Sequence, residues 1–243
     1  VQDAEKLVYI GIDASHYNEY VNGNYKDSMG NFGNLAAGYS VRTVTLNTSE
    51  DLIAACENEK YVALILTAPS RRLAAAQSDP KVYTEAELEA LKAFNAKGGT
   101  VILAGWSDNY ENYDVILSNP AIAHMAAAQN EVLKALGSSL RIGDDATYDD
   151  VRSKADGVDK WRLYFNIYGE NFLTEGVEYD AEHPYDRMYT EVFSHYGGAT
   201  IYAVDGNGTA TSTLPASVSP VVYAHSSTYS VDVDQDGLGG SDI

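Results

Sequence analysis

The chain of 243 residues has a single cysteine, few basic residues and no long apolar run. The single cysteine, Cys56, lies inside an apolar helical pattern. Because there is only one cysteine, an intrachain disulfide and a Cys-x-x-Cys metal site are both excluded. Lys and Arg number 16 against 35 Asp and Glu, and the net charge of −19 repels nucleic-acid phosphates and anionic membrane surfaces. No apolar stretch reaches the length of about 18 residues that a membrane helix needs. We therefore expect no nucleic-acid partner and no direct membrane insertion.

Tyrosine is the abundant aromatic residue, with 19 copies against 5 of Phe. This balance is typical of extracellular bacterial proteins, in which amphipathic tyrosine covers exposed sheets. The chain begins at Val1 and shows no leader segment, as we expect of a piece cut from a longer secreted protein. We therefore expect an extracellular or cell-surface location in a bacterium.

The first part of the chain alternates short apolar runs with amphipathic segments. The predicted strands are 6–13, 41–46, 61–67 and 100–104, followed by a short strand and turn at 140–145. The predicted helices are 31–39, one with Ser49 as N-cap, one from a Thr84–Glu87 capping box to Gly98-Gly99, and 120–136. Strands that are apolar on both faces and alternate with helices indicate a parallel sheet covered on both sides. The pattern predicts a doubly wound, mostly parallel, flavodoxin-like α/β fold.

The second part of the chain is predicted to be rich in β-strands. Residues 146–160 are polar and charged and are predicted to be an excursion. Strands are predicted at 161–168, 199–204 and 220–224, with a turn-rich region at 205–219. We expect a single domain over 1–243, with its core at about 6–145 and a β-rich extension at about 146–243.

Several polar side chains follow the predicted parallel strands at their carboxyl ends, where doubly wound sheets bind ligands. We predict that one ligand-binding rim is formed by Asp13, His16, Ser70, Arg71, Trp106, Ser107 and Asp108. The two serines lack the Gly-x-Ser-x-Gly context of an exposed nucleophile, which favours capping or turn roles for them. Arg71 beside Arg72 suits either an anionic ligand or surface ion pairs.

The run Asp232-Val-Asp-Gln-Asp-Gly237 is the strongest local chemical motif. Alternate carboxylates from Asp232, Asp234 and Asp236, with glycine at the sixth position, are what an oxygen-coordinating Ca²⁺ turn needs. The twelfth position, which is normally a bidentate acid, is Ile243, so the loop lacks that ligand. The motif predicts a Ca²⁺ site, and its alternative is an acidic turn exposed to water.

Residues 6–145 resemble the class I glutamine amidotransferase-like superfamily, in particular its non-catalytic bacterial branches, in the order of elements and loops. In catalytic members, the strand equivalent to Thr100–Ala104 leads into a Gly-x-Cys-x-Gly elbow. The elbow here reads Ala104-Gly-Trp-Ser-Asp108, and no later His-x-Glu pair follows. Without a thiolate and its base, no acyl-enzyme forms. We therefore expect no amidotransferase activity and no histidine within hydrogen-bond reach of the Ser107 hydroxyl.

A second resemblance covers segments 124–137, 141–145 and 229–240. They are similar to a domain carried in large secreted surface proteins of gut-type Gram-positive bacteria. This likeness implies other modules of the same polypeptide as partners, and it implies no activity for this module.

Two functional hypotheses follow. The preferred one is a non-catalytic extracellular module that binds a small-molecule or glycan ligand at the rim, or that only spaces neighbouring domains. The alternative is a metal-assisted hydrolase using Asp13, His16 and Asp108. That alternative requires the three side chains to come within about 5 Å of one point.

Overall fold

The computed structural model describes residues 7–26, 28–111, 124–155, 159–177, 180, 182–183, 192–235 and 237. The chain divides into two compact units. The first unit holds residues 1–106 and 110–142, and the second holds 107–109 and 143–243. The division after Ile142 lies close to the boundary that we expect between core and extension, and the segment 107–109 belongs to the second unit.

A four-stranded parallel sheet in the order β2-β1-β3-β4 forms the centre of the first unit. Its strands are β1 (Val8–Asp13), β2 (Val41–Leu46), β3 (Tyr61–Thr67) and β4 (Thr100–Ala104). β1 pairs with β2 from Val8–Val41 onward, and β3 pairs with β4 from Ala63–Thr100 onward. Helices flank the sheet, so the predicted α/β class and the four predicted strands are confirmed.

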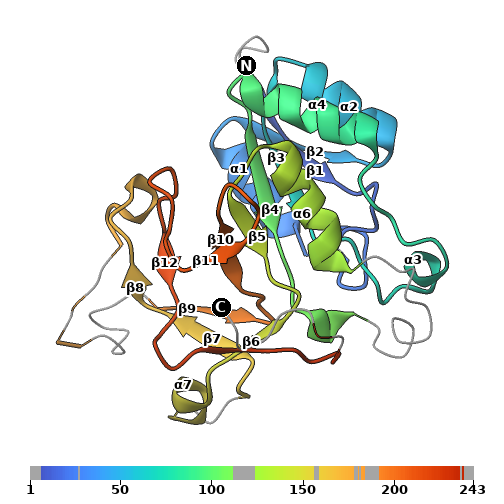
Figure 1. Cartoon of the computed structure of the whole chain (residues 1–243). Helices are drawn as coiled ribbons and strands as arrows, with labels where there is room; N and C mark the ends of the chain where they lie inside the picture. Colours follow the sequence, from blue (N-terminus) through green and yellow to red (C-terminus); the bar gives the residue numbers. More distant parts are fainter. Residues whose placement is uncertain are drawn as a thin grey trace. The chain divides into compact units, whose positions relative to one another are not determined.

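The helices of the first unit are α1 (Gly30–Gly38), α2 (Ser49–Glu57), α3 (Ala74–Ser78), α4 (Glu85–Ala96) and α6 (Met125–Ala135). Three of them, α2, α4 and α6, lie together over the sheet (Figure 1). Their shared core with the strands contains Leu46, Leu52, Leu64, Leu66, Leu91, Phe94 and Val132. α1 packs on β2, and its Gly33 closely approaches the side chain of Thr43. Because side chains alternate along a strand, Thr43 lies on the opposite face of β2 from Leu46.

Capping side chains set the starts of two helices. The predicted capping box of α4 is confirmed, because Thr84 accepts from the Glu87 amide while the Glu87 carboxylate accepts from the Thr84 amide. The N-cap of α2 is Thr48 and not Ser49, because the residue three positions after Thr48 is Asp51, which completes a second capping box. α6 begins at Met125, and positions 120–123 of the predicted helix lie outside the described residues.

The last element of the first unit is the short strand β5 (Leu140–Ile142), at the position predicted for it. The Asn130 side chain of α6 holds it by donating to the Ile142 carbonyl at 2.9 Å and accepting from the Ile142 amide at 2.8 Å. Of the helices that the structure describes, none is both long and apolar enough to cross a membrane.

Small antiparallel pairs of strands make up the second unit. The pairs are β6 (Ala146–Tyr148) with β13 (Tyr229–Val231), β7 (Arg162–Phe165) with β9 (Phe193–Tyr196), β8 (Ile167–Tyr168) with β12 (Val222–Tyr223), and β10 (Ile201–Val204) with β11 (Ala210–Thr211). Two short 3-10 turns, Asp108–Tyr110 and Phe172–Thr174, also occur in the chain.

The polar segment 146–160, which was predicted as an excursion, contains β6 and the helix α7 (Asp150–Ala155). Asp149 starts that helix by accepting from the amides of Val151 and Arg152. The strand predicted at 161–168 is divided at the buried Asn166 into β7 and β8. β9, β11 and β13 were not predicted, because each of these short strands contains Ser, Thr or His and shows no apolar run.

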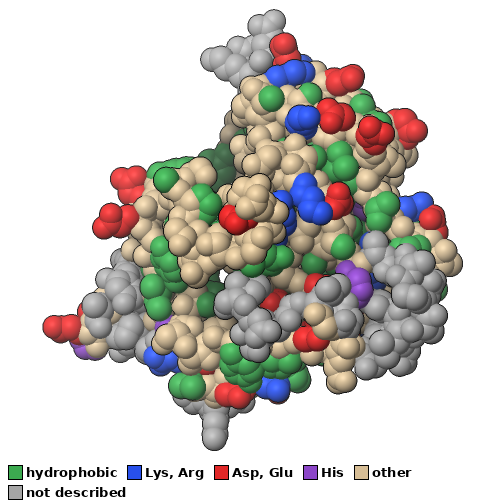
Figure 2. All heavy atoms as spheres, viewed as in Figure 1, with side chains coloured by type: hydrophobic (Ala, Val, Ile, Leu, Met, Phe, Trp, Pro, Cys, Tyr) green, Lys and Arg blue, Asp and Glu red, His purple; other side chains and the backbone are tan. Residues whose placement is uncertain are grey.

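The outer surface of α2 and α4 is acidic. Exposed Glu50 and Glu57 lie on α2, and exposed Glu85 and Glu89 lie on α4. Figure 2 shows red acidic atoms recurring over this part of the molecule, with few blue basic atoms among them. These exposed glutamates account for part of the acidic excess of the sequence.

Replacing Leu64 with Ala is expected to lower the free energy of unfolding of the first unit by about 2–5 kcal/mol, because a cavity replaces a fully buried side chain. Leu35→Ala makes the same deletion at a position that is 64% exposed and should change stability by less than about 0.5 kcal/mol. Urea denaturation followed by Trp106 fluorescence in a Trp161→Phe background measures both. Equal losses in the two variants would contradict the core position of Leu64.

Candidate functional site

A tight acidic turn follows β13 in the second unit. Asp232 lies at its start and accepts from the Gln235 amide at 2.7 Å and from the Gly237 amide at 3.0 Å. Gln235 and Gly237 have left-handed backbones, with φ of 60° and 82°. Glycine adopts this conformation without strain, which is why the predicted loop needs glycine at its sixth position. Asp236 of the predicted motif lies outside the described residues.

Asp108 joins this turn from a distant part of the sequence. One side-chain oxygen from each of Asp108, Asp232 and Asp234 lies within 4.8 Å of the other two. Asp108 Oδ2 also accepts from the Val233 amide at 2.8 Å, which fixes the carboxylate beside the turn. Asp108 and Asp234 are almost fully buried, at 2% and 3% exposed, and Asp232 is half-buried. We name these three side chains the carboxylate triad.

The electrostatics of the carboxylate triad favour a cation. Burial and the neighbouring charge of Asp234 raise the pKa of Asp108 to about 6. Hydrogen bonds from Val233, Asn109 and Ser107 act in the opposite direction, but they do not cancel this rise. Two like charges at this separation repel by an amount on the order of 1–4 kcal/mol, depending on how much water screens them. A divalent cation among the oxygens would convert that repulsion into attraction.

The size of the triad also suits calcium. Ca²⁺ binds oxygen ligands at about 2.3–2.6 Å, so oxygens that share one ion lie no more than about 5 Å apart. The spacing in the triad satisfies this limit. Asp108 supplies an acid from outside the loop, where the sequence motif lacks its twelfth-position ligand. No local signal could identify that residue, since Val233 and Asp108 are 125 positions apart.

The hydroxyl of Ser107 is directed at the neighbouring backbone and carboxylate. It donates to Asp108 Oδ1 at 3.2 Å and accepts from the Asn109 amide at 3.1 Å. The Ser107 amide donates to the Gly197 carbonyl at 3.0 Å. Among the hydrogen bonds of the described residues, none joins an imidazole to this hydroxyl, as the missing cysteine and His-x-Glu pair lead us to expect.

Asp13 and His16 form a buried network in the first unit. His16 Nδ1 lies 2.8 Å from Asp13 Oδ2, and His16 Nε2 lies 3.5 Å from Glu87 Oε2. Ser15, Asn18 and Tyr83 donate to the Asp13 carboxylate. Asp13, His16 and Glu87 are each no more than 3% exposed. Sequence reasoning missed Glu87, which it used only as a helix cap.

The charges in this network support one another. Burial alone would lower the pKa of His16, but hydrogen bonds and charges from Asp13 and Glu87 outweigh it and raise the pKa to about 9. Burial alone would raise the pKa of Glu87, but His16 and the Thr84 amide lower it to about 2. His16 is therefore an imidazolium at neutral pH with a carboxylate at each ring nitrogen. In this state it neither binds a metal nor accepts a proton.

This network bears on the hydrolase alternative. The alternative needs Asp13, His16 and Asp108 around one metal, whereas the two carboxylates that contact His16 do so at opposite ring nitrogens. Asp108 belongs to the second unit, where its partners are in the carboxylate triad. The geometry inside each unit therefore favours a charge network and a cation site over a hydrolytic centre.

Two further rim residues are buried. Ser70 is 0% exposed, and its hydroxyl accepts from the Arg72 amide at 3.3 Å. Arg71 is 1% exposed and donates to the backbone carbonyls of Ser70 and Lys81. The interpretation of Arg71 as a surface arginine was therefore wrong. Burial against backbone carbonyls gives this guanidinium a role in holding loops.

Trp106 lies at the centre of an aromatic cluster in the first unit. Its ring stacks on Tyr20 at 4.9 Å and on Tyr110 at 4.2 Å between centroids, and Tyr25 lies 5.0 Å away. Trp106 is 4% exposed, and its ring N–H is hydrogen-bonded to none of the described residues. The sequence predicted Trp106 at the rim but not its three tyrosine neighbours, of which Tyr20 and Tyr25 lie in the loop between β1 and α1 and Tyr110 lies four residues after Trp106.

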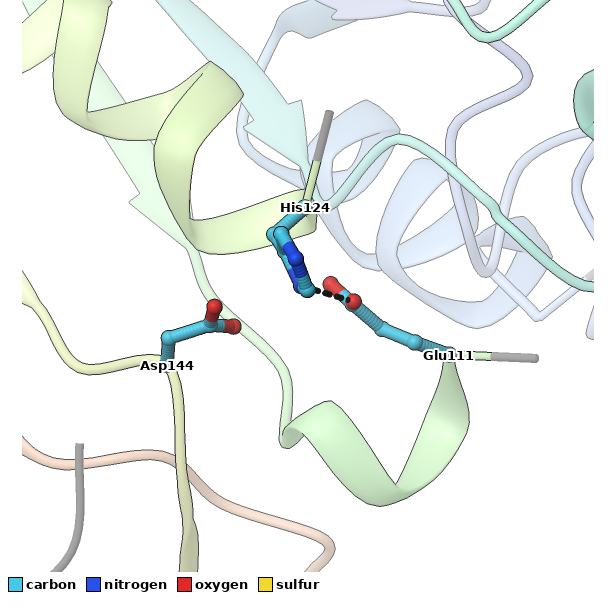
Figure 3. A group of neighbouring side chains, drawn as sticks. All are labelled: Glu111, His124 and Asp144. Atoms are coloured by element: carbon cyan, nitrogen blue, oxygen red, sulfur yellow. Dashed lines mark hydrogen bonds and ion pairs between the residues drawn. The ribbon is translucent and has the colours of Figure 1, made fainter. Parts of the chain in front are cut away.

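A Glu111–His124 pair precedes α6 (Figure 3). Glu111 Oε2 lies 2.7 Å from His124 Nδ1, and Glu111 Oε1 accepts from the Met125 amide at 2.5 Å. His124 occupies the N-cap position of α6 but does not cap it with its own side chain. Glu111 therefore caps the helix from another segment.

The His16–Glu87 pair makes stability depend on pH in a defined direction. Because the pKa of His16 rises from 6.5 to about 9, its contribution is complete below pH 6.5 and is lost as the pH rises through about 9. Because the pKa of Glu87 falls from 4.5 to about 2, its contribution is complete above pH 4.5 and is lost as the pH falls through about 2. Between pH 6.5 and 9, the free energy of unfolding should fall by about 1–3 kcal/mol from His16.

His16→Gln is expected to remove this fall, because a neutral amide does not titrate. His183→Gln is the matched control, because it replaces a histidine of the second unit whose side chain is 49% exposed. Urea denaturation across this pH range measures the slope, with Trp106 as the reporter in a Trp161→Phe background. An identical slope in wild type and His16→Gln would contradict the raised pKa.

No family model, curated protein or solved structure matches this chain. The resemblance to the amidotransferase-like superfamily and the likeness to a surface-protein module therefore stay predictions.

Proposed function

We propose that this chain is a non-catalytic extracellular module whose second unit binds Ca²⁺ through Asp108, Asp232 and Asp234. The observation that carries the proposal is the carboxylate triad, in which three acidic oxygens lie within 4.8 Å of one another and two of the side chains are buried. Buried carboxylates that face each other need either protons or a cation. At neutral pH, which lies above the pKa of about 6 of Asp108, a cation is the better partner.

Calcium is favoured by the donor chemistry and by the expected location. Carboxylate oxygens on a turn suit a large, hard cation with flexible geometry, whereas Mg²⁺ demands near-octahedral ligands and retains its waters. Extracellular calcium modules bind with dissociation constants of about 10⁻⁴–10⁻³ M, which a site with three carboxylates can reach. A site of this affinity fills only where calcium is abundant, as it is outside cells, where we expect this chain to lie.

The finer fold assignment is part of the same proposal. We infer a flavodoxin-like sheet of the glutamine amidotransferase-like kind, carried beside other modules of one polypeptide. The order β2-β1-β3-β4 supports this, because flavodoxin-like sheets begin with the same order. The absence of catalysis is supported by Ser107, whose hydroxyl is engaged by Asp108 and Asn109, and by the charged state of His16.

Calorimetric titration of the chain with CaCl₂ should give one binding site per chain, and Asp108→Asn should weaken binding at least about tenfold by removing one of three charged ligands. A melting scan should show stabilisation by Ca²⁺ that reaches about 2.7 kcal/mol when the free ion exceeds the dissociation constant a hundredfold. Chelator should reverse the shift.

The matched control is Asp205→Asn. Asp205 is an exposed acid of the second unit that also accepts backbone amides in a turn, from Asn207 and Thr209. Its replacement removes the same charge and should leave calcium affinity unchanged. If Asp108→Asn binds as tightly as wild type while the Asp232→Asn, Asp234→Asn double variant does not, the loop binds alone and the triad is wrong. Binding that survives in both means that the ion lies elsewhere.

A second candidate function is the binding of a small or carbohydrate-like ligand at the aromatic cluster of the first unit. Two observations favour it: Tyr25 is 39% exposed over the Trp106 ring, and the buried Trp106 N–H lacks a hydrogen bond to any described residue. Sugar rings pack their C–H faces on aromatic rings, and exposed Asn22 and Asn24 of the same loop offer polar groups.

Titration of galactose or N-acetylglucosamine should change Trp106 fluorescence in a Trp161→Phe background if this second candidate is right. Tyr25→Ala should remove the response, because it deletes the exposed ring of the cluster. Tyr39→Ala is the control, since Tyr39 is 77% exposed and outside the cluster's ring contacts. A lack of response to either sugar would mean that the cluster serves only as a small core.

A further inference from the structure

Asp145 is a fully buried carboxylate beside the carboxylate triad but outside it. It is 0% exposed and directly precedes β6. Its Oδ1 accepts from the Thr200 amide at 2.8 Å, and its Oδ2 accepts from the hydroxyls of Thr200 at 2.6 Å and Ser230 at 2.5 Å. Its carbonyl oxygen accepts from the Asp108 amide at 3.3 Å.

These bonds reach both segments that supply the triad. Ser230 lies in β13, two residues before Asp232, and β13 pairs with β6 through Val231–Ala146 and Ser230–Thr147. Asp108 is a member of the triad, and its own backbone is bound by Asp145. Asp145 therefore contacts both segments that carry the ligands: the backbone of Asp108 and the side chain of Ser230, which lies two residues before Asp232.

We propose that Asp145 is a positioning residue for the calcium site, and this inference rests on the proposed function. Its hydrogen bonds fix the separation between the Asp108 segment and the Asp232 turn before the ion arrives. Partners outside the ligand set hold metal-binding side chains in place, and their loss commonly costs about 10–100-fold in affinity. Asp145 makes no contact with the ion and contributes through Asp108 and Ser230.

A carboxylate suits this task better than an amide. Three donors converge on its two oxygens, and each oxygen accepts without donating in return. An asparagine has one acceptor oxygen and an amino group that would face a donor. Asp145→Asn keeps the shape of the side chain while disturbing at least one of the three bonds.

The test compares calcium dissociation constants by calorimetry in the full chain with substitutions Asp145→Asn, Ser230→Ala and Thr200→Val. Asp145→Asn should raise the constant about tenfold or more, and Ser230→Ala should raise it several-fold. Thr200→Val is the matched control, because it removes a hydroxyl from the same Asp145 oxygen but lies in neither ligand-bearing segment. Its constant should stay within about twofold of wild type, although its melting temperature should fall as in Ser230→Ala.

The outcomes separate this inference from the proposed function. If wild type does not bind calcium, both fail. If wild type binds and Asp145→Asn binds with the same constant, Asp145 serves only the fold, and the inference is overturned while the calcium site stands. If Asp145→Asn does not fold, the Ser230→Ala and Thr200→Val pair decides: equal calcium constants overturn the inference, and a selective loss in Ser230→Ala supports it.

Discussion

Burying an ionised carboxylate costs several kcal/mol unless hydrogen bonds or an opposite charge compensate for the lost water. This constraint acts throughout a chain whose net charge is −19. Among the described residues, eight acidic side chains are no more than 3% exposed: Asp13, Glu19, Glu87, Asp108, Glu111, Asp145, Asp149 and Asp234. The arrangement of polar groups around these acids determines which parts of the molecule are fixed and which respond to ions.

Two kinds of compensation occur. Asp13 and Glu87 share the His16 imidazolium, and Asp145 is surrounded by backbone and hydroxyl donors. In these places the compensation comes from the protein itself. Asp108 differs, because burial and the neighbouring charge of Asp234 hold its pKa up despite three hydrogen bonds. This remaining electrostatic cost is the physical reason to look for a cation there rather than in the His16 network.

The predictable parts of the molecule are those whose cause is local in sequence. β3 is a central strand with a continuous apolar run, and the Thr84–Glu87 capping box is four residues long, so both can be read directly. The Asp232 turn is likewise local, because its left-handed positions and alternate acids lie within six residues. α7 escaped prediction because its segment is polar, and only the Asp149 cap reveals it.

The unpredictable parts depend on contacts between distant segments. Glu87 meets His16, Glu111 caps α6 and Asp145 binds Ser230, and none of these pairs has a spacing that a sequence pattern could display. The same is true of Asp108, which was predicted after the fourth strand, on a rim with Asp13 and His16. Its hydrogen bond to the Val233 amide, which joins it to the C-terminal turn, has no sequence signal.

The segment after β4 shows why covalent acyl transfer and cation binding place opposite demands on one turn. Acyl transfer needs a nucleophile with a base beside it and open space for substrate. Here the Ser107 hydroxyl donates to Asp108, the Asp108 amide is bound by Asp145, and Asp108 is 2% exposed. Such a turn holds a carboxylate still and excludes a substrate, which is unsuitable for covalent catalysis. Fixed, dehydrated carboxylates at matched distances are, however, what a calcium ion binds, so the geometry of this turn supports the proposed cation site.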